Sequence, residues 1–82
     1  MLRRALVAGG DAVRAGADDP AAVRALMLGI LATEPLAMPD YVSVADPDTL
    51  DELETIAGRA LLSLAVVIDG VRLIDNERVA QR

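Results

Sequence analysis

The clearest pattern of apolar and polar positions lies in the last third of the chain. From Leu61 to Ile68 the only polar side chain is Ser63, and Asp69-Gly70 separates this run from a second apolar-rich stretch. An apolar, β-branched run stopped by Asp-Gly predicts a β-hairpin with a two-residue type I′ turn. Both central positions of that turn need positive φ, which Asp tolerates and Gly adopts without steric cost.

A two-residue turn also predicts the register of the hairpin. The expected cross-strand pairs are Ile68 with Val71, Val66 with Leu73, and Leu64 with Asp75. The first strand shows almost no alternation of polar residues, so we expect both of its faces to be covered. We therefore place Leu61–Ile68 at the centre of a small sheet.

Helical spacing predicts a first helix from Leu2 to Gly16. Gly9-Gly10 lies inside it, and each Gly costs about 1 kcal/mol relative to Ala in a helix interior. We expect a kink, a close helix crossing or a break at this point. The same dipeptide is weak evidence for a phosphate loop, because no strand precedes it and no Lys-Ser/Thr follows.

A second helix is predicted from Pro20 to Thr33 or Glu34. Asp19 is suited to the N-cap, Pro20 to the first helical position, and Pro35 ends the helix. Its predicted buried face comprises Val23, Leu26, Met27, Ile30 and Glu34. Leu28 and Leu31 lie off that face, so we expect a second partner: the first helix, another domain or another subunit.

Between the second helix and the hairpin we predict a linker over Leu36–Asp40, a strand over Tyr41–Val44 and one short helical turn over Thr49–Glu54. Glu77–Arg82 reads as a polar tail. The order predicts an α+β fold in a single domain, residues 1–82. Two N-terminal helices pack on one face of a small three-stranded, mainly antiparallel sheet that ends in a β-hairpin.

The composition narrows the function classes. The net charge of −5 argues against nucleic-acid binding, and no apolar stretch approaches the roughly 20 residues that span a bilayer. We expect a cytoplasmic protein. Without His, Cys or Lys the chain lacks the usual bases, nucleophiles and soft metal ligands. A self-sufficient enzyme is not expected, and no catalytic, cofactor-binding or metal-binding residue is assigned.

Several polar residues have a functional and a structural interpretation. The acidic cluster comprises Asp46, Asp48, Asp51, Glu52 and Glu54. An EF-hand counted from Asp46 would need Gly at the sixth position and Glu at the twelfth, where this chain has Asp51 and Ala57, so a solvated turn is favoured. Arg72 and Asp75 are interpreted as surface or interface pairs. Tyr41 is interpreted as a packed residue with its hydroxyl in water.

Three segments resemble one known family. They are Leu2-Arg3-Arg4-Ala5-Leu6, then Asp40-Tyr41-Val42 leading to Asp46-Pro47-Asp48-Thr49-Leu50, and Gly58-Arg59-Ala60-Leu61-Leu62 with Arg72 to Asn76. In this order they are similar to the C-terminal domain of the pantothenate synthetase family, the pantoate–β-alanine ligases. The middle segment resembles the family's DYVELVDPxTL stretch.

The resemblance implies a hinged lid. Enzymes of the family join pantoate to β-alanine through pantoyl adenylate, using ATP and magnesium on an N-terminal Rossmann-like domain with an HxGH signature. The implied partner is that catalytic domain, which this chain lacks, and the implied cofactors belong to the full-length enzyme. By this resemblance the chain begins inside the first helix of the lid, so Met1 falls within an expected helix, which implies a truncated chain. Val67 and Val71 replace Arg and Thr that the family often has, removing polar contacts.

A second hypothesis belongs to another class of protein. The chain would be a free-standing α+β interaction module without catalytic activity, forming a homodimer through the second helix. The excess apolar surface at Leu28 and Leu31 motivates it.

Overall fold

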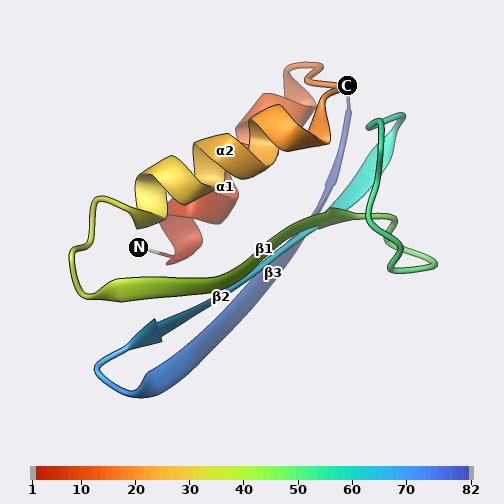
Figure 1. Ribbon diagram of the computed structural model, residues 1–82. Coiled ribbons are helices and arrows are strands. Elements are labelled where there is room, and N and C mark those ends of the chain that lie inside the picture. Colours follow the sequence, from red (N-terminus) through yellow and green to blue (C-terminus); the bar gives the residue numbers. More distant parts are fainter. Residues whose placement is uncertain (1, 82) are drawn as a thin grey trace.

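The computed structural model describes residues 2–81, and Met1 and Arg82 lie outside the described residues. The elements are α1 (Leu2–Arg14), α2 (Pro20–Leu31), β1 (Ala37–Ala45), β2 (Arg59–Ile68) and β3 (Val71–Ala80). The strands form one antiparallel sheet in the order β1-β2-β3, and both helices lie on one of its faces (Figure 1). The predicted α+β arrangement is confirmed. Within residues 2–81, no helix has the length and apolar character to cross a membrane.

The hairpin of β2 and β3 has the predicted turn and register. Asp69 and Gly70 have φ of 50° and 78°, the positive values that a type I′ turn requires. Ile68 pairs with Val71, Val66 with Leu73, and Leu64 with Asp75. The local turn chemistry was sufficient to set this register.

The core lies between the helices and the inner face of the sheet. Its largest fully buried side chains are Leu6, Val13, Val23, Met27, Leu31, Val44, Ile56, Leu62, Leu64 and Val66. Burying each such side chain is worth about 1.5–3 kcal/mol, so this one layer is the main source of stability.

The prediction that both faces of β2 are covered is wrong. The helices cover only the inner face, and Leu61 and Val67 on the outer face are half-buried. Ala65 on that face is nevertheless buried. Its register neighbours Tyr41 and Ile74 are much larger side chains, so they flank the small residue between them.

Helix α1 runs without a break through Gly9-Gly10, so the expected irregularity takes the form of a close crossing. A Cβ on Gly9 would lie 2.9 Å from Sδ of Met27 and 3.1 Å from Cδ1 of Leu62. On Gly10 it would lie 3.1 Å from Cγ1 of Val79. The two glycines let α1 approach both α2 and the sheet.

Helix α2 ends earlier and turns a different face to the core than predicted. Asp19 accepts from the backbone N–H of Ala21 as the expected N-cap, and the last helical residue is Leu31. The backbone N–H groups of Thr33 and Glu34 bond three residues back, which tightens the chain into a turn before Pro35.

The buried stripe of α2 comprises Pro20, Val23, Met27 and Leu31. Leu31 was predicted to lie off the core and is fully buried, whereas Leu26 was predicted to be buried and is 42% exposed. The helix has apolar residues almost all around, so the positions of α1 and β1, not the local pattern, select the buried stripe.

Strands β1 and β3 are longer than predicted. The expected linker Leu36–Asp40 is mostly strand, because β1 is an edge strand that tolerates Pro39 and has a register shift between Pro39 and Tyr41. The expected polar tail Glu77–Arg82 is strand up to Ala80. Val79 anchors that end under α1, where it is buried.

The expected helical turn over Thr49–Glu54 does not form. The Asp46 carboxylate accepts the backbone N–H groups of Asp48 and Thr49, and Leu50 has a φ of 67°, which excludes a right-handed helix. Glu52 instead forms an isolated bridge with Ala45.

Candidate functional site

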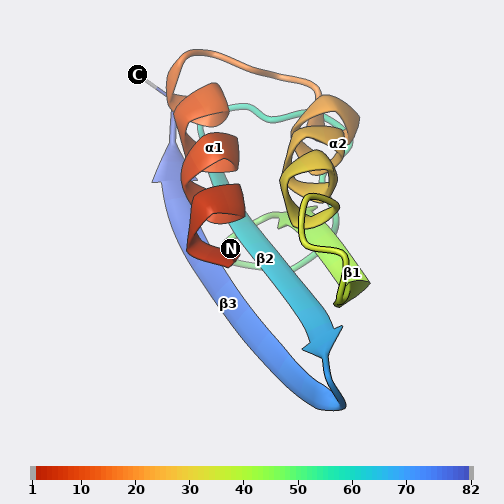
Figure 2. The ribbon, with the colours of Figure 1, turned by 90° about the vertical axis from the view of Figure 1, so that its left-hand side faces the viewer.

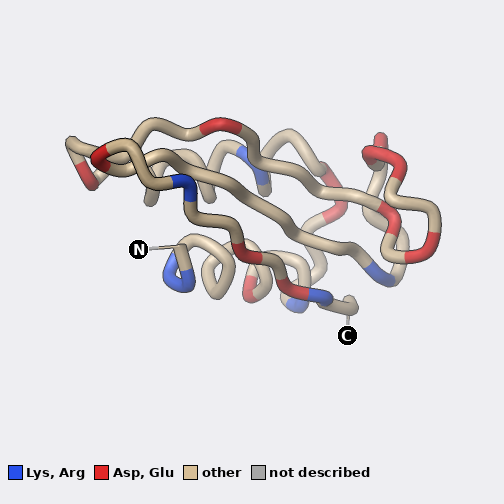
Figure 3. Tube along the Cα trace, turned by 90° about the horizontal axis from the view of Figure 1, so that it is seen from below, with Lys and Arg blue, Asp and Glu red and all other residues tan. Residues whose placement is uncertain are grey.

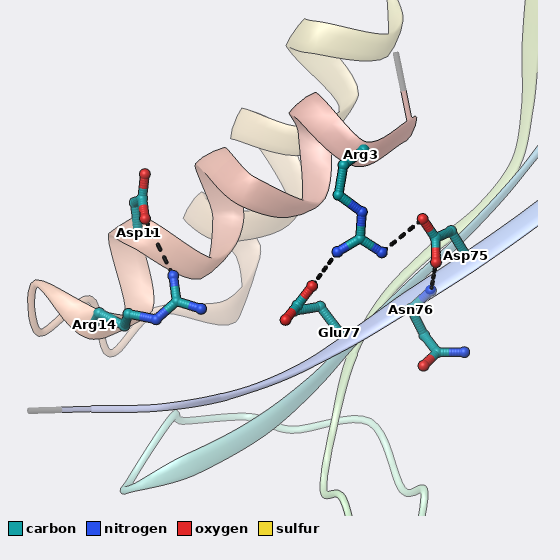
Figure 4. A network of polar contacts seen from close by, with 6 residues as sticks. All are labelled: Arg3, Asp11, Arg14, Asp75, Asn76 and Glu77. Atoms are coloured by element: carbon teal, nitrogen blue, oxygen red, sulfur yellow. Dashed lines mark hydrogen bonds and ion pairs between the residues drawn. The ribbon is translucent and has the colours of Figure 1, made fainter.

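A network of three charged side chains fastens α1 to β3 (Figure 4). The Arg3 guanidinium donates to Oδ2 of Asp75 at 2.8 Å and to a carboxylate oxygen of Glu77. Asp75 and Glu77 pair with Leu64 and Leu62, so they lie on the inner face beside the core. The sequence predicted Asp75 as a member of a surface or interface pair, without naming Arg3 as its partner.

The network shifts the proton affinity of two of its members. The hydrogen bond from Arg3, and to a smaller extent the one from the backbone N–H of Asn76, lowers the pKa of the Asp75 carboxyl. The hydrogen bonds to Asp75 and Glu77 in turn raise the pKa of Arg3 above its ordinary value. Both groups stay charged at neutral pH, so the network serves as a fastening and not as a proton donor or acceptor.

Asp75→Asn removes the charge that pairs with Arg3, so it is expected to lower the free energy of unfolding at pH 7. The loss should be only about 0.5 kcal/mol, because solvent screens an ion pair at the surface. The folded pKa of Asp75 lies below the unfolded value of about 3.9, so its stabilisation is present above that pH and lost below it. The difference between variant and parent should therefore close as the pH falls below about 4, which urea titrations between pH 7 and pH 2 measure. When Arg3→Met is already present, adding Asp75→Asn should change the free energy of unfolding very little. A gap that persists at pH 2 would contradict this interpretation.

Glu52 makes the most side-chain contacts of the acidic cluster among those described. Its Oε1 accepts hydrogen bonds from the backbone N–H of Val44 at 2.9 Å and from Nη1 of Arg24 at 3.1 Å. Its Oε2 accepts a hydrogen bond from the Ser43 hydroxyl at 2.6 Å. It thereby ties α2, β1 and the following loop together. Sequence reasoning missed this role, because its partners in α2 and β1 lie outside its local pattern.

Two other carboxylates of the acidic cluster, those of Asp46 and Asp48, make separate contacts. Asp46 closes its own turn, and the N–H donors of Asp48 and Thr49 lower the pKa of its carboxyl. Asp48 pairs with Arg59 at 2.7 Å. Among residues 2–81 no group of three or more acidic side chains converges to hold a metal ion.

The outer face of the sheet carries a second polar group. Arg72 pairs with Asp40 at 2.9 Å and its guanidinium lies 5.9 Å from the centre of the Tyr41 ring. Tyr41 is 40% exposed, so it packs only partly. Because Arg72 lies on the outer face and Asp75 on the inner face, these two residues belong to separate clusters.

Charged residues are sparse along the central strand: β2 carries a charge only at its first residue, Arg59 (Figure 3). An open pocket of about 190 Å³ lies at that end of the sheet. Its lining residues are Pro47, Arg59, Ala60, Arg78, Val79 and Ala80. Arg59 already pairs with Asp48, which leaves Arg78 as the other cation beside the pocket.

Exposed aliphatic side chains are the other notable feature of the surface. The large ones include Val7, Leu26, Leu28, Leu36, Met38, Leu50, Val71, Leu73 and Ile74. Val67 and Val71, singled out above, lie near the hairpin turn on opposite faces of the sheet. Apolar side chains are therefore exposed on both helices and on both faces of the sheet.

Comparison with known proteins identifies the family of this chain. The family model described as pantoate-beta-alanine ligase matches residues 1–78. The chain belongs to this family.

The pantothenate synthetase of Chloroflexus aurantiacus (strain J-10-fl) is 56% identical over 77 residues, and that of Moorella thermoacetica is 48% identical over 75. These matches cover 93% and 92% of the chain but only 27% and 26% of the relatives. The crystal structure of pantothenate synthetase from Thermus thermophilus superposes with a TM-score of 0.83 at 29% identity, covering 93% of this chain and 27% of that one. The chain therefore spans about a quarter of the length of the relatives it matches.

Proposed function

We propose that this chain is the C-terminal lid domain of a pantoate–β-alanine ligase. The observation that carries the proposal is the family match over residues 1–78 combined with coverage of only 27% of the Chloroflexus aurantiacus relative. The residues of the chain fit a covering role: it has no His or Lys for the chemistry, and a rigid two-layer fold.

In the proposed enzyme, pantoate and β-alanine are joined through pantoyl adenylate on a catalytic domain that binds ATP and magnesium. This chain would close over that domain, exclude water and help to order the reactants. A cytoplasmic location is part of the same proposal. The chain itself contributes apolar cover and a rigid backbone, and the bond-making groups reside on the partner.

The activity of the isolated chain tests the proposal. With pantoate and ATP it is expected to release no pyrophosphate above the background without protein, because the chain has no group that can activate the reactants. A chimera, in which this chain replaces the matching segment of the full-length Chloroflexus aurantiacus enzyme, is expected to make pantothenate. Turnover by the isolated chain, or a folded chimera without activity, would overturn the proposal.

A homodimer through α2 is the second candidate for the partner. Leu28 favours it, since this side chain is 41% exposed on α2, but the burial of Leu31 removes half of the surface that motivated it. Sedimentation velocity at increasing concentration tests it: a dimer should form at micromolar concentration and be weakened by Leu28→Gln. A monomer throughout would exclude this candidate.

A further inference from the structure

The inner face of the sheet extends beyond the helices at the hairpin end (Figure 2). Val66 is fully buried there, but the next inner-face positions are not: Leu73 is 40% exposed, Val71 is 58% exposed and Ile68 is half-buried. We call Ile68, Val71 and Leu73 the hairpin ledge. Ile68 also pairs with Ala37 on β1, next to the exposed Leu36, so apolar surface continues across the ledge.

The beginning of α1 lies directly beside this ledge. Arg3, in the first turn of α1, bonds to Asp75, and Asp75 lies only two residues from Leu73 on the same face of β3. Figure 2 shows the N-terminal end of α1 facing the bare part of the hairpin. Any polypeptide that precedes α1 in the longer relatives must therefore enter the fold at the hairpin ledge.

The proposed function places such a polypeptide before α1. The Chloroflexus aurantiacus enzyme is matched over only 27% of its length, so nearly three quarters of it lies outside the part that this chain covers. Contiguous exposed aliphatic side chains of this kind mark surfaces that another protein covers. The ledge has no charged side chain among its three members, which suits burial against another apolar surface.

We propose that the hairpin ledge is the surface on which the catalytic portion of the enzyme, the segment preceding α1, packs against this domain. The inference rests on the proposed function and adds the contact surface to it. It commits to the inner face and not to the outer one, where Met38, Tyr41 and Ile74 are also exposed but lie on the side of the sheet away from α1.

Cysteine reactivity distinguishes the two faces, because the chain has no Cys of its own. Val71→Cys on the ledge and Ile74→Cys on the outer face form a matched pair, with native exposures of 58% and 56%. The rate of alkylation of each thiol, read by peptide mass spectrometry, is compared between the isolated chain and the full-length chimera described above. Leu73→Cys provides a second ledge position if Val71→Cys fails to fold.

In the chimera the ledge thiols are expected to react at least about tenfold more slowly than in the isolated chain, because alkylation then requires local opening. Ile74→Cys should change by less than about twofold. An active chimera with unprotected ledge thiols, or one that protects only Ile74→Cys, would overturn this inference and leave the proposed function standing. Ledge thiols in the isolated chain that become protected as its concentration rises would assign the ledge to a second copy and also overturn it. An inactive, folded chimera would refute the proposed function itself.

Discussion

Leu64→Ala is expected to lower the free energy of unfolding by about 3–5 kcal/mol, the range for truncating a fully buried leucine that leaves a cavity. Leu64 lies in the middle of the central strand, is 0% exposed and belongs to the core cluster. A domain of this size has a total stability of only about 4–12 kcal/mol. The variant should therefore be close to unfolded at 37 °C, as seen by circular dichroism and urea titration.

Leu28→Ala is the matched control, because it makes the same chemical change in a side chain that is 41% exposed. Its cost should stay near or below about 1 kcal/mol, as for surface positions without special contacts. Equal losses in the two variants would show that the single buried layer between helices and sheet is not where the stability resides.

The hairpin was predictable because its determinants are local. Asp69-Gly70 selects the turn, the turn selects the register, and no distant residue has to be known. The helix starts and the order of the elements follow from equally local chemistry, such as Asp19 before Pro20.

The buried face of α2 was not predictable, because the choice depends on tertiary packing. Leu26 and Leu31 are equally apolar, and only the positions of α1 and β1 decide that Leu31 is buried. The length of β3 also depends on tertiary packing. Glu77 was predicted to belong to a polar tail, but it lies in β3, where it accepts a hydrogen bond from Arg3, 74 residues away in the sequence.

The outer face of β2 is where the apolar pattern of the strand led to a wrong prediction. The run Leu61–Ile68 is apolar on both faces, which led to the prediction of cover on both. Helices cover only one of them. On the other, Ala65 is buried between the larger side chains of its register neighbours Tyr41 and Ile74, an arrangement that depends on strand pairing and not on the local sequence.

The family was predictable from the sequence, but the polar contacts of the candidate site were not. The resemblance of residues 40–50 and 72–76 indicated the family, and the family match confirms it. The Arg3 network and the Glu52 contacts were not predicted, since each depends on a side chain meeting a distant backbone or carboxylate. Both fasten separate elements to one another.

Gly9→Val is expected to destabilise the domain by about 2–3 kcal/mol, the upper part of the range for overpacking. The added Cβ alone would lie 2.9 Å from Sδ and 3.0 Å from Cγ of Met27, and the two methyl groups would need further space at the crossing of α1, α2 and β2. Met27 can move its flexible side chain for a single methyl group, so Gly9→Ala should cost much less. The gain in helix propensity of about 1 kcal/mol offsets part of that cost.

Gly29→Ala separates packing from propensity, because a Cβ at Gly29 meets no atom within 4 Å. It should raise the free energy of unfolding by about 0.5–1 kcal/mol, through helix propensity alone.

If the crossing is the cause of the Gly9→Val loss, adding Met27→Ala should cost less in the Gly9→Val background than in the parent, because the two changes share one space. Additive losses, measured by urea titration of the parent, the two single variants and the double variant, would place the damage in the backbone of α1 and not at its contact with α2.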